Sequence, residues 1–387
     1  MKLYEYEGKG LFREKGLPVP RGMMVTSAEA AAEAATQLGG EVVIKSQILQ
    51  GGRGKAGGIK FATSPEEARE KAAAILGTTL KAETVSKLLI EERLAIAREL
   101  YLSITIDPVQ ASPLIMASAT GGMDIEEVAR ETPEGIIKET IPIFRGLMPF
   151  QARRIAFLLG LTGKEVNAFA AILLKLYQVF RSYDAELVEI NPLVITNEGK
   201  MLAADAKVNI YDGALFRQKE FVKGPERYDN EREYQAAQYG LGYVKLDGNI
   251  GVLCTGAGLT MTVLDLIKYY GGQPANFLEF GGATYKNSYY AMQLVLEDPD
   301  VKVILINTFG LVARADVISQ GLAQAIKELK PRQPIVASIR GTGEEEARRI
   351  LKEEAGIEPY ANVEAAVQAA VKLAGGQSHG DPLGQGN

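Results

Sequence analysis

The stretch GNIGVLCTGAGLTM, residues 248–261, decides the fold class of the second half of the chain. A short apolar run, typical of a buried strand, ends in a glycine turn at Gly256 and Gly258, and a helical pattern follows. The same strand-turn-helix unit recurs with strand patterns at residues 276–280, 301–308 and 334–339. Strands that alternate with helices in this way predict a doubly wound parallel sheet in an α/β fold.

Glycines gather where such a sheet would bind a ligand, at the carboxyl ends of its strands. The glycines that follow the predicted strands are Gly256, Gly258, Gly281, Gly282, Gly310, Gly341 and Gly343. The first turn lacks the third glycine of a dinucleotide-binding fingerprint, because Met261 takes its place. An ordinary tight turn therefore explains it equally well.

Polar, charged sequence separates the parallel-sheet domain from the first part of the chain. We place this linker at residues 229–245. It divides an N-terminal region, residues 1–228, from the parallel-sheet domain at 246–376. The last residues, 377–387, are polar and glycine-rich, which predicts a disordered tail.

The net charge and the rarest residues exclude several kinds of site. A formal net charge of −5 argues against a nucleic-acid partner. The single cysteine, Cys254, excludes an intrachain disulfide and a thiolate metal site. The single histidine, His379, lies in the predicted tail, so histidine chemistry within the folded part of the chain is excluded. Without a signal-peptide pattern or a membrane-length apolar run, we expect a cytoplasmic protein with no membrane partner.

A basic, glycine-rich stretch, KSQILQGGRGKAGGIK at residues 45–60, follows a predicted strand. A Walker A loop is excluded, because Leu49 replaces its first glycine and Ala56 replaces the Ser or Thr after the Gly-Lys pair. Glycine N–H groups and the charges of Lys45 and Arg53 nevertheless suit phosphate oxygens. On these residues alone, a basic surface turn is the favoured interpretation.

Polar side chains on a predicted hairpin, residues 185–196 and 200–208, form a candidate metal site. Glu189 and Asn191 are two apart on one strand and share a face, and Asp205 lies on the partner strand. Mg²⁺ usually takes one or two carboxylates together with substrate phosphates. Because an unpaired carboxylate is costly in apolar strands, a Mg²⁺ site is favoured over ordinary polar surface.

Several motifs, in order, extend these observations: LYEYEGKGLFREKGLPVP, GGRGKAGG, EINPLVIT, ALFRQ, DGNIG, GAGL and PANFLEFGGA. Together they resemble the β subunit of succinyl-CoA synthetase, the ADP- or GDP-forming succinate–CoA ligase, from Met1 to about Leu373. The resemblance implies an N-terminal ATP-grasp region of two subdomains and a C-terminal flavodoxin-like CoA-ligase domain. It also implies an α-subunit partner, in an αβ or α2β2 assembly, that carries most of the CoA site and the phosphorylated histidine.

The resemblance implies roles for individual residues. The nucleotide would be held by Lys45, Gly52, Arg53 and Gly54 at its phosphates and by Glu91, Leu94 and Glu99 at its base and ribose. Mg²⁺ would be held by Asn191 and Asp205, and Glu189 would orient the partner's histidine. Pro20 resembles members that use ADP and ATP, so ATP is expected rather than GTP.

The resemblance implies that the organic acid would bind at Thr255, Gly310, Leu311 and Val312, and the sequence departs from the family pattern at all of these positions except Gly310. Thr255 replaces the asparagine of an Asn-Gly-Ala-Gly turn, and a hydroxyl is a shorter group than an amide. Leu311 replaces the second glycine of Phe-Gly-Gly-Ile, which adds a side chain where backbone amides should meet a carboxylate and restricts positive φ.

The predicted activity is that of an acid–CoA ligase, in which ATP, a carboxylic acid and CoA give acyl-CoA, ADP and phosphate through a phosphohistidine on the partner and an acyl phosphate. Succinate needs no new chemistry, whereas the departures favour another acid such as malate or citrate. Two further alternatives remain open at this point: a stand-alone ATP-grasp carboxylate–amine ligase, and a non-catalytic nucleotide-binding scaffold subunit.

Overall fold

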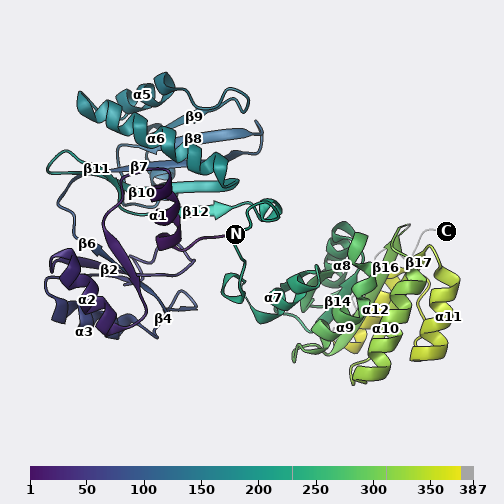
Figure 1. Ribbon diagram of the computed structural model, residues 1–387. Coiled ribbons are helices and arrows are strands. Elements are labelled where there is room, and N and C mark those ends of the chain that lie inside the picture. Colours follow the sequence, from purple (N-terminus) through teal and green to yellow (C-terminus); the bar gives the residue numbers. More distant parts are fainter. Residues whose placement is uncertain (229, 311, 376–387) are drawn as a thin grey trace. The chain divides into compact units, whose positions relative to one another are not determined.

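The computed structural model describes residues 1–228, 230–310 and 312–375. The chain divides between Lys223 and Gly224 into two compact units (Figure 1). Leu311 and the predicted tail, 377–387, with its His379, lie outside the described residues. Across the described part of the chain, no helix is both long and apolar enough to cross a membrane.

The first unit contains two main antiparallel sheets, of four and six strands. The smaller one has the spatial order β1 (Gly22–Val25), β6 (Leu88–Glu92), β2 (Val42–Ser46) and β3 (Ile59–Ala62). It packs against α2 (Ala28–Leu38) and α3 (Pro65–Ile75), which begin at the serine caps that the sequence predicts. The side chains of Ser27 and Ser64 each accept a hydrogen bond from the backbone N–H three residues further on. A short hairpin, β4 (Thr79–Leu80) and β5 (Glu83–Thr84), follows α3.

The larger sheet has the order β11 (Met201–Ala203), β10 (Ala185–Thr196), β7 (Ile96–Asp107), β8 (Ser112–Ser118) and β9 (Ile136–Thr140), and β12 (Lys207–Ile210) also pairs with β10. Its core is shared with α1 (Glu5–Glu14), α5 (Pro149–Leu158) and α6 (Lys164–Ser182). Apolar side chains of α6 recur at helical spacing and are buried in this core: Phe169, Leu173, Leu176 and Phe180. The short helix α4 (Ile125–Glu131) lies between β8 and β9 in the sequence.

The prediction of a single strand at residues 200–208 is wrong, because the chain leaves the strand at Ala204–Ala206. The strands on either side, β11 and β12, both pair with β10. At the break, the carbonyl oxygen of Ala204 accepts hydrogen bonds from the ammonium groups of Lys9, at 2.8 Å, and Lys45, at 2.6 Å. Asp205 therefore lies in a bend rather than on a strand.

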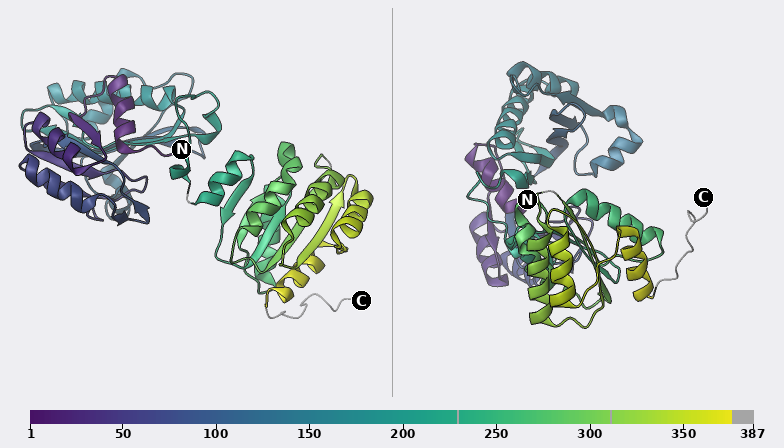
Figure 2. Two further views of the ribbon diagram at one scale, coloured as in Figure 1. Left: turned by 60° about the horizontal axis from the view of Figure 1, so that its bottom comes forward. Right: turned by 90° about the vertical axis from the view of Figure 1, so that its right-hand side faces the viewer.

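The second unit is the predicted doubly wound sheet, with the order β13 (Gly242–Lys245), β15 (Asn276–Glu279), β14 (Ile250–Cys254), β16 (Val303–Gly310) and β17 (Ile335–Gly341). All strands except the edge strand β13 are parallel, and their order matches the flavodoxin-like arrangement. One core involves α8 (Ala257–Tyr269) and α12 (Val363–Leu373). The other involves α9 (Ser288–Leu296), α10 (Ala315–Leu329) and α11 (Glu344–Ala355), so helices cover both faces of the sheet (Figure 2).

The predicted linker, 229–245, contains regular structure that belongs to the second unit. It includes α7 (Glu231–Gln238), whose Ala236 is buried in the core, and β13, which pairs with β15. Because Ala236 is the only buried residue of α7, the rest of this helix is polar and its composition is like that of a linker.

Cys254, at the end of β14, is expected to be unreactive in the folded protein. It is fully buried, and burial raises the pKa of its thiol to about 12, so that very little thiolate exists at pH 8. We expect a thiol reagent such as DTNB to leave the native chain unmodified and to react with one thiol per chain after denaturation in guanidinium. Rapid stoichiometric reaction of the native chain would contradict this description of β14.

Candidate functional site

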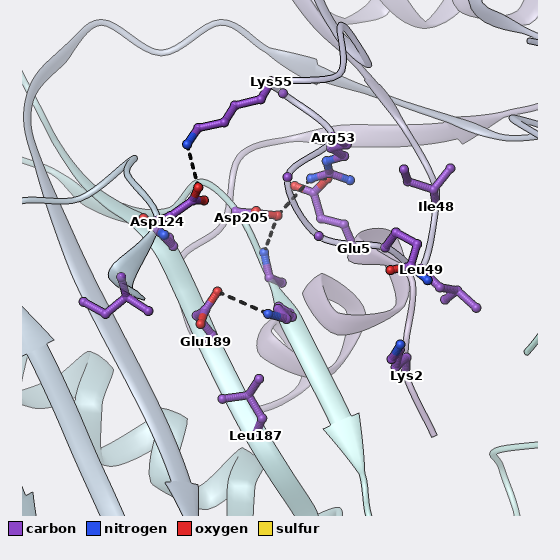
Figure 3. Close-up of a pocket in the computed structure, with 18 of the residues that line it drawn as sticks. Lys2, Glu5, Ile48, Leu49, Arg53, Lys55, Asp124, Leu187, Glu189 and Asp205 are labelled. Carbon is purple, nitrogen blue, oxygen red and sulfur yellow. Dashed lines mark hydrogen bonds and ion pairs between the residues drawn. The ribbon is translucent and has the colours of Figure 1, made fainter. Parts of the chain in front are cut away.

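A cavity of about 690 Å³ in the first unit brings together two segments that lie far apart in the sequence (Figure 3). One wall is the glycine-rich stretch, including Gly52–Gly54, and the other consists of β10 and the bend before β12. The charged and amide side chains that line it include Glu5, Arg53, Asp124, Glu189, Asn191 and Asp205. The predicted phosphate loop and the predicted metal hairpin therefore face the same space.

Two contacts hold the glycine-rich stretch in place, one at Gly51 and one at Lys55. The ammonium group of Lys81 donates a hydrogen bond to the carbonyl of Gly51 at 2.5 Å. Lys55 forms an ion pair with Asp124 at 2.5 Å, across the opening of the cavity (Figure 3). Between them, Gly52 has a φ of +73°, a conformation that favours glycine. The stretch is an exposed turn, as expected from these residues alone, and it also forms one wall of the cavity.

Two cations of this stretch line the cavity, the exposed Lys55 and the buried Arg53. The guanidinium group of Arg53 pairs with Glu5 and with Asp205, the latter at 2.9 Å, and donates to the carbonyl of Ser46 at 3.1 Å. Burial alone would lower the pKa of Arg53, but the two carboxylates raise it above its usual value. The arginine therefore carries a fixed positive charge beside a space large enough for a phosphorylated ligand.

Asp205 presents its carboxylate to the cavity from the bend, with 35% of the side chain exposed. Its Oδ1 accepts hydrogen bonds from Arg53 and, at 2.8 Å, from the N–H of Ala206. Burial, and then the charge of Glu5, raise the pKa of Asp205 even though Arg53 opposes this shift. A carboxylate in such a setting gains from the approach of a further cation.

Glu189 and Asn191 project from β10 into the same cavity. Glu189 accepts a hydrogen bond from the hydroxyl of Tyr101 at 3.1 Å and lies 4.0 Å from the ammonium group of Lys207. Burial raises the pKa of Glu189. The amide of Asn191 is held by the backbone of the turn before α4, because its Oδ1 accepts from Gly122 at 2.7 Å and its Nδ2 donates to Met123 at 2.8 Å.

The oxygen atoms of Asn191 and Asp205 have the chemistry that Mg²⁺ requires. One carboxylate and one amide oxygen make up the protein's share of a site that is usually completed by water and substrate phosphates. Among the described residues, no group of three or more His, Cys, Asp and Glu side chains could hold a metal ion. The donor set thus fits a hard cation that arrives with a phosphorylated ligand.

Lys45 and Glu91, both predicted to bind nucleotide, lie behind the wall of the cavity. The ammonium group of Lys45 pairs with Glu5 at 2.9 Å and with Glu91 at 2.7 Å. These two carboxylates raise the pKa of Lys45, against the lowering effect of its burial. Glu91 is 1% exposed and also pairs with Lys9 at 2.6 Å. In this arrangement Glu91 contacts lysines instead of facing a ligand.

The other two predicted base and ribose residues lie further along the chain, after β6. Leu94 lies between β6 and β7, and Glu99 is on β7, where its carbonyl accepts a hydrogen bond from Gly121 at 3.0 Å. Neither residue is among the described residues that line the cavity.

Two of the predicted acid-binding residues, Thr255 and Gly310, lie at the carboxyl ends of two adjacent parallel strands of the second unit. Thr255 follows β14 and Gly310 ends β16. The Thr255 hydroxyl accepts a hydrogen bond from the N–H of Phe309 at 3.0 Å and donates to its carbonyl at 3.3 Å. The hydroxyl therefore joins the two strand ends, and Thr255 is only 4% exposed. Val312 is 80% exposed.

The sequence analysis missed several residues of this site, among them Glu5 and Lys9. These two lie four apart on α1, on the same face as the buried Phe12, and form an ion pair at 2.8 Å. A charged pair at helical spacing next to apolar core positions was the available signal.

Comparisons with known proteins find relatives over most of the chain. The family model of the ATP-grasp domain matches residues 2–195, and that of the CoA-ligase matches 253–373. The chain is 47% identical over 362 residues to the β subunit of ADP-forming succinate–CoA ligase of Aquifex aeolicus, covering 91% of this chain and 93% of that one. It is 45% identical over 378 residues to a subunit of the ADP-forming sulfoacetate–CoA ligase of Bilophila wadsworthia, covering 98% and 100%. In fold, it is similar to ATP citrate lyase of Methanothrix soehngenii, with a TM-score of 0.76, 19% identity, and coverage of 96% and 99%.

Proposed function

The chain belongs to the β-subunit family of succinate–CoA ligases, and on that basis we propose that it is the nucleotide-binding subunit of an ATP-dependent acid–CoA ligase. The observation that carries the proposal is the cavity in which Arg53 and the glycine N–H groups face Asn191 and Asp205. A cationic wall opposite oxygen donors suits the phosphates of ATP together with their Mg²⁺ ion.

The reaction consists of two phosphoryl transfers followed by one acyl transfer. The γ-phosphoryl group of ATP passes to a histidine of the α subunit, which leaves ADP. It then passes to the carboxylate of the acid, which gives an acyl phosphate. The thiolate of CoA attacks the acyl carbon, and inorganic phosphate leaves. The relay histidine is assigned to the partner because His379, the only histidine of this chain, is in the polar C-terminal segment.

The residues of the cavity then take specific roles. The charge of Arg53 and the N–H groups of Gly52 and Gly54 would hold the phosphates, since phosphoryl transfer is catalysed mainly by positioning and charge neutralisation. Asn191 and Asp205 would bind Mg²⁺, which supplies further neutralisation of phosphate charge when bound. Glu189 would accept a hydrogen bond from the partner's imidazole and orient it. ATP is proposed rather than GTP because Pro20 resembles family members that use ADP and ATP.

The acid is proposed to be a small dicarboxylate, with succinate first. Because some residues depart from the family pattern, above all Thr255, the acids to be assayed also include malate, citrate and sulfoacetate. The hydroxyl of Thr255 is engaged by the backbone of Phe309, so it offers an acid less than a free amide would.

The test is to co-express the chain with its α-like partner and to measure CoA-dependent formation of ADP with each acid. A clear preference for succinate, with kcat/KM at least tenfold above the other acids, would support succinate as the substrate. A preference for another acid would support the shift in specificity. ADP formation that requires none of the acids would contradict the proposed function.

A further inference from the structure

Helix α1 brings two charged side chains under the floor of the cavity. Glu5 lines the cavity, and Lys9, one turn further on, is fully buried behind it. The helix approaches the bend that carries Asp205 closely, because a Cβ atom added at Gly8 would lie 3.2 Å from the Cβ of Ala206. The N-terminal helix is therefore part of the structure that supports the site.

The ammonium group of Lys9 has three hydrogens and meets three acceptor groups. These are the carboxylate of Glu5 at 2.8 Å, that of Glu91 at 2.6 Å and the carbonyl of Ala204 at 2.8 Å. Glu91 is on the smaller sheet and Ala204 is in the bend of the larger one. Lys9 thus joins both sheets of the first unit at one buried point.

The contacts form a single buried cluster of balanced charge. Its three carboxylates and three cations are Glu5, Glu91, Asp205, Lys9, Lys45 and Arg53. Without Lys9, three carboxylates would face two cations, and the excess negative charge would lie directly behind the wall that receives the phosphates. A buried charge that has lost its partner is strongly unfavourable.

We propose that Lys9 is a positioning residue for nucleotide binding: it compensates Glu5 and Glu91, so that Lys45 and Arg53 keep their positive charge available to the phosphates. Lys9 does not contact the nucleotide, and its effect passes through the two carboxylates. The inference rests on the proposed function of the cavity as the nucleotide site.

The experiment compares Mg²⁺·ADP affinity of the wild-type complex with that of Lys9→Met, by titration with a fluorescent ADP analogue. We expect the affinity for ADP to fall about 10- to 30-fold, because one uncompensated carboxylate repels the phosphates through partly buried surroundings that screen the charge poorly. KM for ATP should rise to a similar extent, while kcat and KM for CoA change less than about threefold. The Lys9→Met/Glu91→Gln double variant lacks one cation and one carboxylate, so the cluster is again balanced with two of each, and most of the affinity for ADP should return. Arg13→Met, on the exposed face of the same helix, is the matched control.

The outcomes distinguish a failure of the inference about Lys9 from a failure of the proposed function. A folded Lys9→Met complex with wild-type ADP affinity would overturn the inference, and so would a double variant that binds no better than Lys9→Met. If Lys9→Met does not fold, the double variant alone decides: near wild-type affinity supports the inference, whereas a tenfold loss or failure to fold overturns it. A wild-type complex that binds no Mg²⁺·ADP would instead overturn the proposed function.

Discussion

The Asp205→Asn variant is expected to lose about 10²- to 10³-fold in kcat/KM for ATP, the size of effect found when a preorganised electrostatic group is removed from an active site. The amide keeps the shape of the side chain but removes the negative charge that the bend presents to the cavity. It also replaces the ion pair of Asp205 with Arg53, at 2.9 Å, by a neutral hydrogen bond at most, while Arg53 keeps its ion pair with Glu5. The measurement is steady-state ADP formation by the α/β complex across a range of Mg²⁺ concentrations, and the Mg²⁺ requirement should rise.

The matched control is Glu198→Gln, in the turn between β10 and β11. It makes the same carboxylate-to-amide change on a side chain that is 72% exposed and far along the hairpin from the bend. This variant should retain wild-type kinetics. If the two variants have equal kcat/KM values, Asp205 does not hold the metal ion.

The Glu189→Gln variant is expected to lower kcat about 10²-fold, the lower end of the effect of a positioned acid or base. Glutamine can still accept the hydrogen bond that Tyr101 donates, so the local fold should persist. It lacks the charge that would hold the partner's imidazole in its reactive orientation. The affinity for Mg²⁺·ADP should stay within about threefold of wild type, because Glu189 is not assigned to the nucleotide or the metal ion.

For Glu189, the control is Glu186→Gln on the same strand, where the side chain is exposed. Rapid-quench measurement of phosphoryl transfer separates a defect in transfer from a defect in binding. A normal rate of transfer in Glu189→Gln would remove this residue from the mechanism.

The fold was largely predictable because its second unit consists of local repeats. Each parallel strand is an apolar run followed by a glycine turn, and both signals lie within a few residues. The predicted linker differs from the structure because α7 buries only Ala236 and joins the core through β13, a tertiary contact that composition does not encode. The break of the hairpin at Ala204–Ala206 depends in the same way on distant lysines.

The site was predictable in its residue types but not in its contacts. The residues Arg53, Glu189, Asn191 and Asp205 do line one cavity. Lys45 and Glu91 were expected at the ligand, yet they pair with Glu5 and Lys9 of α1. These partners are 40 or more positions away in the sequence, and no local pattern links residues so far apart. Likewise, Thr255 was predicted from the turn motif alone, and its bonds to Phe309 depend on strand pairing.

The central claim is that this chain passes the γ-phosphoryl group of ATP to a histidine of a partner subunit. The most direct measurement incubates the co-expressed complex with ATP labelled in its γ-phosphate and separates the subunits. We expect an acid-labile, base-stable label on the partner, which the carboxylic acid substrate together with CoA releases and which the Asp205→Asn complex does not form. Label that never appears on the partner, although the wild-type complex binds Mg²⁺·ADP, would contradict the account.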